Sequence, residues 1–235
     1  MALRNCLSYG HPAGIVLIGG ISMVITIGGK YGCGGRPISK KLAEILGYRL
    51  CDDEIITEAV KNSEFDMKEE TFRYFDEGQG KASMSEIEIL SNAQRNYMNA
   101  AEDLSFDVIP LDRAMDEIQG TILNRLADEG NCILLGRCAD YYLAGRKDVL
   151  SVLVTDDEEQ CVRNIMEAYP DLNEKEAGKL VKKTNRRRED YYSFFTCKRW
   201  CDPENYAITI NCSLLGGVDK TAEFLAGAIR ALEKN

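Results

Sequence analysis

Short apolar runs alternate along this chain with longer stretches in which apolar residues recur every three or four positions. Short runs that are rich in β-branched side chains and bounded by glycine or polar residues predict buried strands. Such runs lie at residues 24–27, 48–51, 131–135, 149–154 and 207–210. The stretches between them have the spacing of amphipathic helices.

The predicted helices have apolar stripes and suitable residues at their ends. Pro37 lies in the first turn of one helix, and Gly47 ends it. Asn173 and Glu176 have the spacing of a capping box that opens a long basic helix, and Asp156 or its neighbour caps the helix before it. Three stripes are Ile38, Leu42, Ile45 and Leu46; Leu111, Met115, Ile118, Ile122 and Leu126; and Val218, Ala222, Leu225, Ile229 and Leu232.

Strands that alternate with helices predict an α/β protein, in which a parallel sheet of five strands is covered by helices on both faces. The expected single domain spans residues 23–235, with a helical insertion at about 63–128 and a helical lid at about 173–200. In such folds ligands bind at the carboxyl edge of the sheet, where the insertion enters. Residues 1–22 are expected to be a poorly ordered extension.

Composition narrows the functional classes. The formal net charge of the 235 residues is −9, which argues against a general role in coating nucleic acid. The nine cysteines are odd in number and irregularly spaced, so free buried thiols are expected rather than disulfides or a zinc site. The apolar run at 13–29 faintly resembles a signal peptide, but it is rich in glycine and shares residues with the first strand. A cytoplasmic protein without a membrane segment is therefore expected.

The turn after the first strand is the strongest functional signal. Gly29, Gly32, Gly34 and Gly35 lie within seven residues, interleaved with Lys30, Tyr31 and Cys33. A backbone without Cβ atoms can aim several N–H groups inward, and the following helix adds the positive end of its dipole. This is a cradle for polyphosphate, although the same glycines could form a tight turn that binds nothing.

The turn departs from the common phosphate-loop pattern G-x-x-x-x-G-K-[ST]. Gly29 and Gly34 have the required spacing, but Gly35 stands where lysine is expected, and Arg36 and Pro37 follow. Arg36 or Lys30 can supply the missing positive charge from a neighbouring position. Magnesium would then depend on water and a carboxylate, and we assign it no protein ligand.

Three stretches resemble the cytidylate-kinase-like proteins, relatives of bacterial cytidylate kinase. They read ITIGGKYGCGGRPISKKLAEILGYRLCDDEII, GNCILLGRCADYYL and RRREDYYSFFTCKRWCDPENYAITINCS. The resemblance runs from Met23 to the C-terminus and points to a divergent branch whose phosphate loop reads G-x-G-G-R. It implies a three-layer fold of the P-loop nucleoside-monophosphate-kinase type.

The resemblance also implies roles for residues beyond the loop. Residues 29–36 would hold the phosphates of the donor ATP. Asp52 matches an aspartate that faces the acceptor nucleotide, although it could instead cap a helix. Arg137 matches an acceptor-side arginine, and Asp140 is a weaker candidate beside it.

The lid is the third implied feature. The basic run from Lys179 to Arg188 resembles a helix that closes over the phosphates, whereas a solvated charged face is the ordinary alternative. Arg188 precedes two tyrosines in an R-x-x-Y-Y pattern of the family, so Arg188 and Arg186 are the expected phosphate contacts. Asn211 and Ser213 follow the last strand and are expected to cap the final helix or to meet an adenine.

Together these features predict a kinase that transfers a phosphoryl group from ATP, with Mg²⁺, to a small acceptor. Arg36, Arg137, Arg186 and Arg188 are the expected catalytic cations. The acceptor is expected to be a nucleoside monophosphate. Two alternatives remain: a nucleotide-binding sensor that has lost catalysis, and a kinase for a non-nucleotide acceptor. No nucleic-acid partner is expected, and a homodimer could form through apolar residues such as Ile87, Leu90 and Met98.

Overall fold

The computed structural model describes residues 22–52 and 111–233. The predicted N-terminal extension, most of the helical insertion and the apolar residues expected at a dimer contact lie outside these ranges. The helices and strands are β1 (Val24–Gly29), α1 (Gly35–Leu46), β2 (Arg49–Cys51), α5 (Leu111–Asp128), β3 (Cys132–Leu135), α6 (Ala139–Tyr142), β4 (Val149–Thr155), α7 (Glu158–Ala168), α8 (Glu174–Thr196), a 3₁₀ turn (Pro203–Asn205), β5 (Ile208–Asn211) and α9 (Val218–Leu232).

All five predicted strands are present, and they form one parallel sheet in the order β2-β3-β1-β4-β5. β1 is central, and Ile27 pairs with Leu135 of β3 on one side and Val152 of β4 on the other. The first four residues of β1 are buried, because neighbouring strands and helices on both faces exclude water. The turns after β1 and β3 therefore leave neighbouring strands at the same edge of the sheet.

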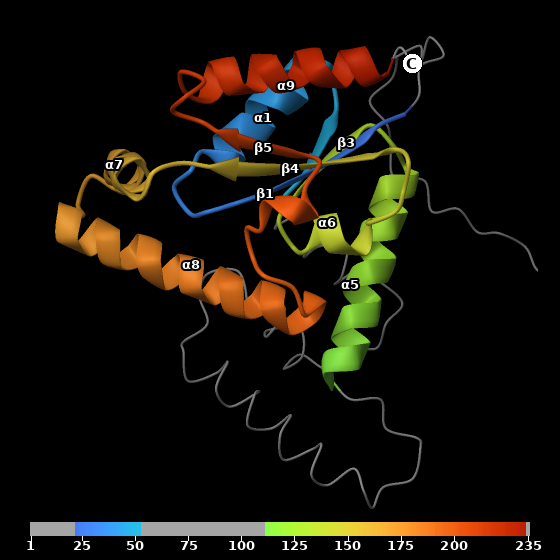
Figure 1. The fold of residues 1–235 in the computed structure, drawn as a ribbon, viewed down its shortest axis with the longest axis horizontal. Coiled ribbons are helices and arrows are strands. Elements are labelled where there is room, and N and C mark those ends of the chain that lie inside the picture. Colours follow the sequence, from blue (N-terminus) through green and yellow to red (C-terminus); the bar gives the residue numbers. More distant parts are fainter. Residues whose placement is uncertain (1–21, 53–110, 234–235) are drawn as a thin grey trace, which may run out of the picture.

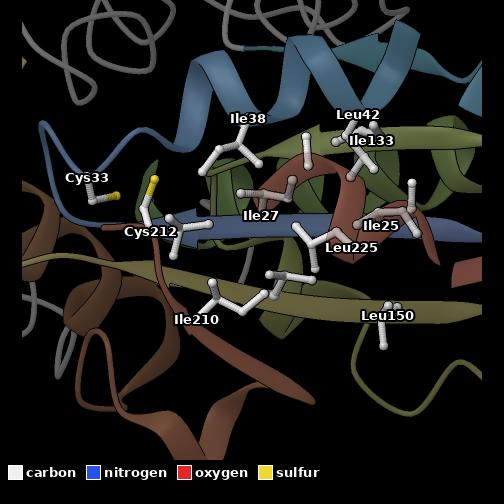
Figure 2. Packing of buried hydrophobic residues seen from close by; sticks show 14 of the residues in the cluster. Ile25, Ile27, Cys33, Ile38, Leu42, Ile133, Leu150, Ile210, Cys212 and Leu225 are labelled. Carbon is white, nitrogen blue, oxygen red and sulfur yellow. The ribbon is translucent and has the colours of Figure 1, made fainter. Parts of the chain in front are cut away.

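Helices α1 and α9 lie together on one face of the sheet (Figure 1). Ile38 and Leu42 of α1 are fully buried, and each contributes about 2 kcal/mol relative to an exposed side chain. Gly47 ends α1 in the left-handed conformation, as predicted, and its N–H bonds the carbonyl of Ala43. Ile38 and Leu42 belong to an apolar cluster that also contains Leu225 of α9 and Cys33 (Figure 2). Cys33 lies in the turn between β1 and α1.

A second apolar cluster involves helices α5 and α6. It combines the predicted stripe of α5, represented by Ile118, Ile122 and Leu126, with Tyr192 and Phe195 from the carboxyl-terminal half of α8. The amino-terminal half of α8 instead packs beside α7 in the first cluster. Helix α8 therefore belongs to both clusters and lies across one side of the domain (Figure 1).

The helix caps are partly as predicted. Asn173 and Glu176 form the expected capping box at the start of α8, with both hydrogen bonds at 3.0 Å. The expectation that Asn211 or Ser213 caps the last helix is wrong, because the N-cap of α9 is Gly217. The Ser213 hydroxyl donates to Asp156 instead, over 2.7 Å.

The described cysteines are free thiols, as expected, and all of them except Cys197 and Cys201 are buried. They pack as small apolar side chains. Among residues 22–52 and 111–233, no helix combines the length and the apolar character that crossing a membrane requires.

Candidate active site

A cavity of about 530 Å³ opens at the carboxyl ends of β1 and β3. Its floor is the turn between β1 and α1, and its walls come from the turn after β3, the end of α7 and the inner side of α8. The predicted site residues that line it are Gly29, Lys30, Gly32, Cys33, Gly34, Gly35, Arg36, Arg137, Asp140 and Arg188. The fold thus brings together most of the residues that the sequence singled out.

The glycine turn has the backbone geometry of an anion cradle. Gly32 and Gly34 have φ angles of 86° and 89°, which side-chain-bearing residues rarely adopt. A Cβ atom on Gly29 would collide with the carbonyl oxygen of Val154. Gly35 differs, because a Cβ atom there would meet nothing within 4 Å. Glycine at position 35 is therefore not required by packing, and a side chain has room where the common motif carries lysine.

The amino-terminal end of α1, with Gly35, Arg36 and Pro37, borders the cavity. Its N-cap, Gly34, makes no side-chain hydrogen bond, and the first turn holds no acidic residue. The helix dipole gives this end a partial positive charge, which favours a bound anion.

Two asparagines hold the glycine turn from outside. Asn164 of α7 donates to the carbonyl of Gly32 over 2.7 Å, and Asn185 of α8 accepts from the N–H of Tyr31 over 2.7 Å. Sequence reasoning missed both, because their partners are 132 and 154 residues away. No local pattern distinguishes such an asparagine from one at the surface.

Arg188 lies over the same turn, whereas Arg186 does not. The Arg188 guanidinium donates to the carbonyl of Gly29 over 2.9 Å and lies 5.5 Å from the centre of the Tyr31 ring. Arg186 is largely exposed and forms ion pairs with Glu189 and Asp190 on its own helix. Only one of the two expected lid arginines therefore lines the cavity.

Arg36 and Asp52 are ion-paired. Nη1 of Arg36 lies 3.4 Å from Oδ2 of Asp52, and the Asp52 side chain is 14% exposed. The sequence placed these two residues on the donor and acceptor sides respectively. Their pairing joins the start of α1 to the end of β2, and it places a carboxylate beside the glycine turn.

The turn after β3 presents a buried arginine in an unusual backbone conformation. Gly136, Arg137 and Cys138 have successive φ angles of 73°, 57° and 55°. Arg137 is only 2% exposed, although it also lines the cavity. Its carbonyl accepts a hydrogen bond of 3.0 Å from Nε2 of Gln119 on α5. Sequence reasoning missed Gln119, a buried amide beside the apolar stripe of α5.

Tyr191 of α8 completes this group. Its hydroxyl donates to Oε1 of Gln119 and also interacts with the Arg137 side chain. Burial raises the pKa of Tyr191 above its ordinary value, and the neighbouring Arg137 charge partly opposes that rise. The phenol therefore stays protonated and acts as a hydrogen-bond donor at neutral pH.

Asp140 lies in a separate polar group with two tyrosines. The Tyr192 hydroxyl donates to Oδ2 of Asp140 over 2.6 Å, and Tyr206 interacts with Tyr192 in turn. Burial raises the pKa of Asp140, while the bond from Tyr192 and the charge of Lys198 oppose the rise. The Tyr206 hydroxyl also lies against Gly28, where a Cβ atom would be 2.9 Å away.

The thiol of Cys33 is not suited to covalent catalysis. Cys33 lies within the glycine turn and is 1% exposed, and burial raises the pKa of its thiol to about 12. Thiolate is the nucleophilic form, so this cysteine is chemically inert at neutral pH. The chemistry that the site offers is electrostatic, because cations and backbone N–H groups line a cavity that suits an anion.

Comparisons with known proteins agree with this geometry. A protein of Eubacterium ventriosum ATCC 27560, described as uncharacterized, has a solved structure that is 21% identical, with a TM-score of 0.61 and coverage of 88% of this chain and 98% of that one. Shikimate kinase from Bacteroides thetaiotaomicron is 12% identical, with a TM-score of 0.50 and the same two coverages. At these identities the structures show a shared fold.

Comparison with curated proteins gives no match. Residues 24–214, which include the glycine turn, the Arg137 turn and α8, match the description "Cytidylate kinase-like family". A family of this kind points to phosphoryl transfer, in keeping with a cavity built from cations and backbone N–H groups. The chain belongs to the cytidylate kinase-like family.

Proposed function

We propose that this protein transfers the γ-phosphoryl group of ATP to a nucleoside monophosphate. The observation that carries the proposal is the convergence of Lys30, Arg137 and Arg188 on one cavity that ends at the uncapped start of α1. Phosphoryl transfer needs little covalent help from a protein. It needs two anions held in line and the charge between them neutralised.

The residues present fit the phosphates of a nucleotide. The glycine turn leaves room for an anion against the N–H groups of α1, and Lys30 lies in the turn itself. Arg188 would exchange its bond to the Gly29 carbonyl for a phosphate oxygen. Arg137, in the turn after the neighbouring strand β3, would hold the phosphate of the acceptor.

A magnesium ion has fewer protein groups available to bind it than the phosphates have. The hydroxyl of Ser39, the first one on α1, is buried and donates to the carbonyl of Gly35 over 2.8 Å. Asp52 is the carboxylate beside the turn, and it is paired with Arg36. A magnesium ion would therefore be held mainly by phosphate oxygens and water, with Asp52 contributing directly or through water. The ion would neutralise phosphate charge.

The test is an ADP-release assay with ATP, magnesium and a panel of CMP, dCMP, UMP, AMP, GMP and no acceptor. We expect release to depend on one or more acceptors. Arg188→Ala should lower kcat about 100-fold, because it removes a cation from the transferring group. Arg36→Ala should lower kcat less than Arg188→Ala does, since Arg36 is half-exposed and paired with Asp52.

Two further arginines sharpen the assay. Arg186 lies on the same helix but outside the cavity, and we expect Arg186→Ala to change kcat less than threefold. Arg163→Ala, on the exposed side of α7, is the matched control for loss of one positive charge. ATP binding without turnover on any acceptor would reject the kinase proposal and favour a nucleotide sensor.

A kinase for a hydroxyl-bearing acceptor is the second candidate, and Asp140 favours it. A partly buried carboxylate in the cavity, with a raised pKa, is suited to take a proton from an attacking hydroxyl. A nucleoside monophosphate is already ionised and needs no such base. Asp140→Asn should therefore leave nucleotide phosphorylation within about tenfold, whereas it should lower phosphorylation of an alcohol by about 10² or more.

A further inference from the structure

Gln119 is a buried polar side chain, and both its amide nitrogen and its amide oxygen form hydrogen bonds. It is 1% exposed on a helix face that is otherwise apolar. Its Nε2 donates to the Arg137 carbonyl over 3.0 Å, and its Oε1 accepts from the Tyr191 hydroxyl. A buried amide costs about 1–3 kcal/mol when left unsatisfied, so an apolar residue would be the simpler choice for packing alone.

The backbone that Gln119 holds is strained. Arg137 and Cys138 both have left-handed φ angles, and each costs roughly 1–2 kcal/mol without a glycine. The turn is anchored at one end by the N–H of Gly136, which bonds the carbonyl of Ile27 over 2.9 Å. The Gly136 carbonyl accepts from the N–H of Ala139 over 3.1 Å, and Gln119 holds the carbonyl of Arg137. The direction in which the Arg137 side chain leaves the backbone therefore depends on this amide.

The same amide reaches helix α8 through Tyr191. Tyr191 and Arg188 are three residues apart and lie on the same side of the helix, where Arg188 reaches the glycine turn. Tyr191 also interacts with the Arg137 side chain. Gln119 thus connects the arginine after β3 with the helix that carries the cation of the glycine turn.

We propose that Gln119 is a positioning residue that aims Arg137 at the acceptor and sets Arg137 relative to α8. This inference rests on the proposed function, in which Arg137 binds the acceptor phosphate. Gln119 itself does not line the cavity and acts through Arg137. It should therefore affect the acceptor much more than ATP.

The test compares Gln119→Met with Asn124→Leu. Methionine has a similar length to glutamine but lacks both hydrogen-bonding groups. Asn124 lies on the same helix and donates to the main-chain carbonyl of Gly120 over 2.9 Å, away from the cavity, which makes it a matched control. We expect Gln119→Met to lower kcat/KM for the acceptor about 10- to 100-fold, because a displacement of about 1 Å is enough for that loss. The KM for ATP should change less than threefold.

Tyr191→Phe distinguishes the effects of the two hydrogen bonds that the Gln119 amide makes. It removes the link to α8 but leaves the bond from Gln119 to the Arg137 carbonyl, so its effect should be smaller than that of Gln119→Met. The two changes together should cost less than the sum of the single effects, because both act on Arg137. Thermal unfolding of each variant verifies that it folds.

Ligand binding gives a readout that does not need turnover. Trp200 is the only tryptophan and lines the cavity, so its fluorescence reports binding of ATP and of CMP separately. Gln119→Met should weaken CMP binding about tenfold and leave ATP binding within threefold. A variant that loses both equally, or behaves like Asn124→Leu, would overturn the positioning role. A wild-type protein that binds CMP without turnover would reject the kinase proposal alone, whereas one that neither binds CMP nor turns over would reject both.

Discussion

The turns after β1 and β3 both present groups to the cavity, but they do so in different ways. Both leave the carboxyl ends of neighbouring strands, both have residues with positive φ, and both line the same cavity. The first uses Gly32 and Gly34 for its positive φ angles and offers its backbone to the ligand. The second places Arg137 and Cys138 in the same region of φ and offers a side chain.

The difference shows which parts of a site need outside support. The glycine turn adopts its conformation at little steric cost, although Asn164 and Asn185 also hold it. The Arg137 turn is strained and buries a charge, so it depends on Gln119 and Tyr191 from two other helices. Removing support should therefore damage the second turn more than the first. Three predictions test this comparison.

The largest effect is expected at Arg137. Arg137→Lys keeps the charge but loses the planar guanidinium that can meet a phosphate and Tyr191 together. We expect kcat/KM for the acceptor to fall about 100-fold, while ATP affinity, measured by Trp200 fluorescence, changes less than threefold. Retention of near wild-type turnover would show that a point charge is enough and that the fixed geometry of the second turn is unimportant.

The next effect concerns the first turn and compares two adjacent glycines. Gly34→Ala introduces a side chain at a φ of 89° and should lower the free energy of unfolding by about 1–2 kcal/mol. Gly35→Ala is the control, because its Cβ atom meets open space, and it should change stability by less than about 0.5 kcal/mol. Urea unfolding measures both. Equal losses would contradict the view that conformation at Gly34 is the requirement.

The smallest effect concerns chemical reactivity in the first turn. Burial raises the pKa of Cys33 from 9.0 to about 12, so the fraction of thiolate at pH 8 falls about 1,000-fold. Iodoacetamide should modify the exposed Cys197 before Cys33, and it should leave Cys33 unmodified until high pH or a denaturant opens the turn. Peptide mass spectrometry measures both sites. Rapid labelling of Cys33 in the folded protein would show that the glycine turn opens more readily than its packing implies.

Several site residues were predictable because their signals are local. The glycines of the first turn, Lys30 within it and Arg137 just beyond a strand are each recognisable from their neighbours in the sequence. Arg186 and Arg188 were both expected contacts from one basic run, with Arg188 favoured by the R-x-x-Y-Y pattern. The structure separates them, because a helix turns about 100° per residue, so positions two apart face different ways.

The sequence by itself determined the strands, the main helices, the capping box of α8 and the position of the glycine turn. These features depend on hydrophobic periodicity and backbone preference, which act over a few residues. Only the tertiary structure decided that Asn164 and Asn185 hold the glycine turn, that Arg36 pairs with Asp52, and that Gln119 connects Arg137 with α8. The physical reason is the sequence separation of the interacting residues. The fold decides which partner a polar side chain bonds, and in these cases that partner lies in another element of the fold.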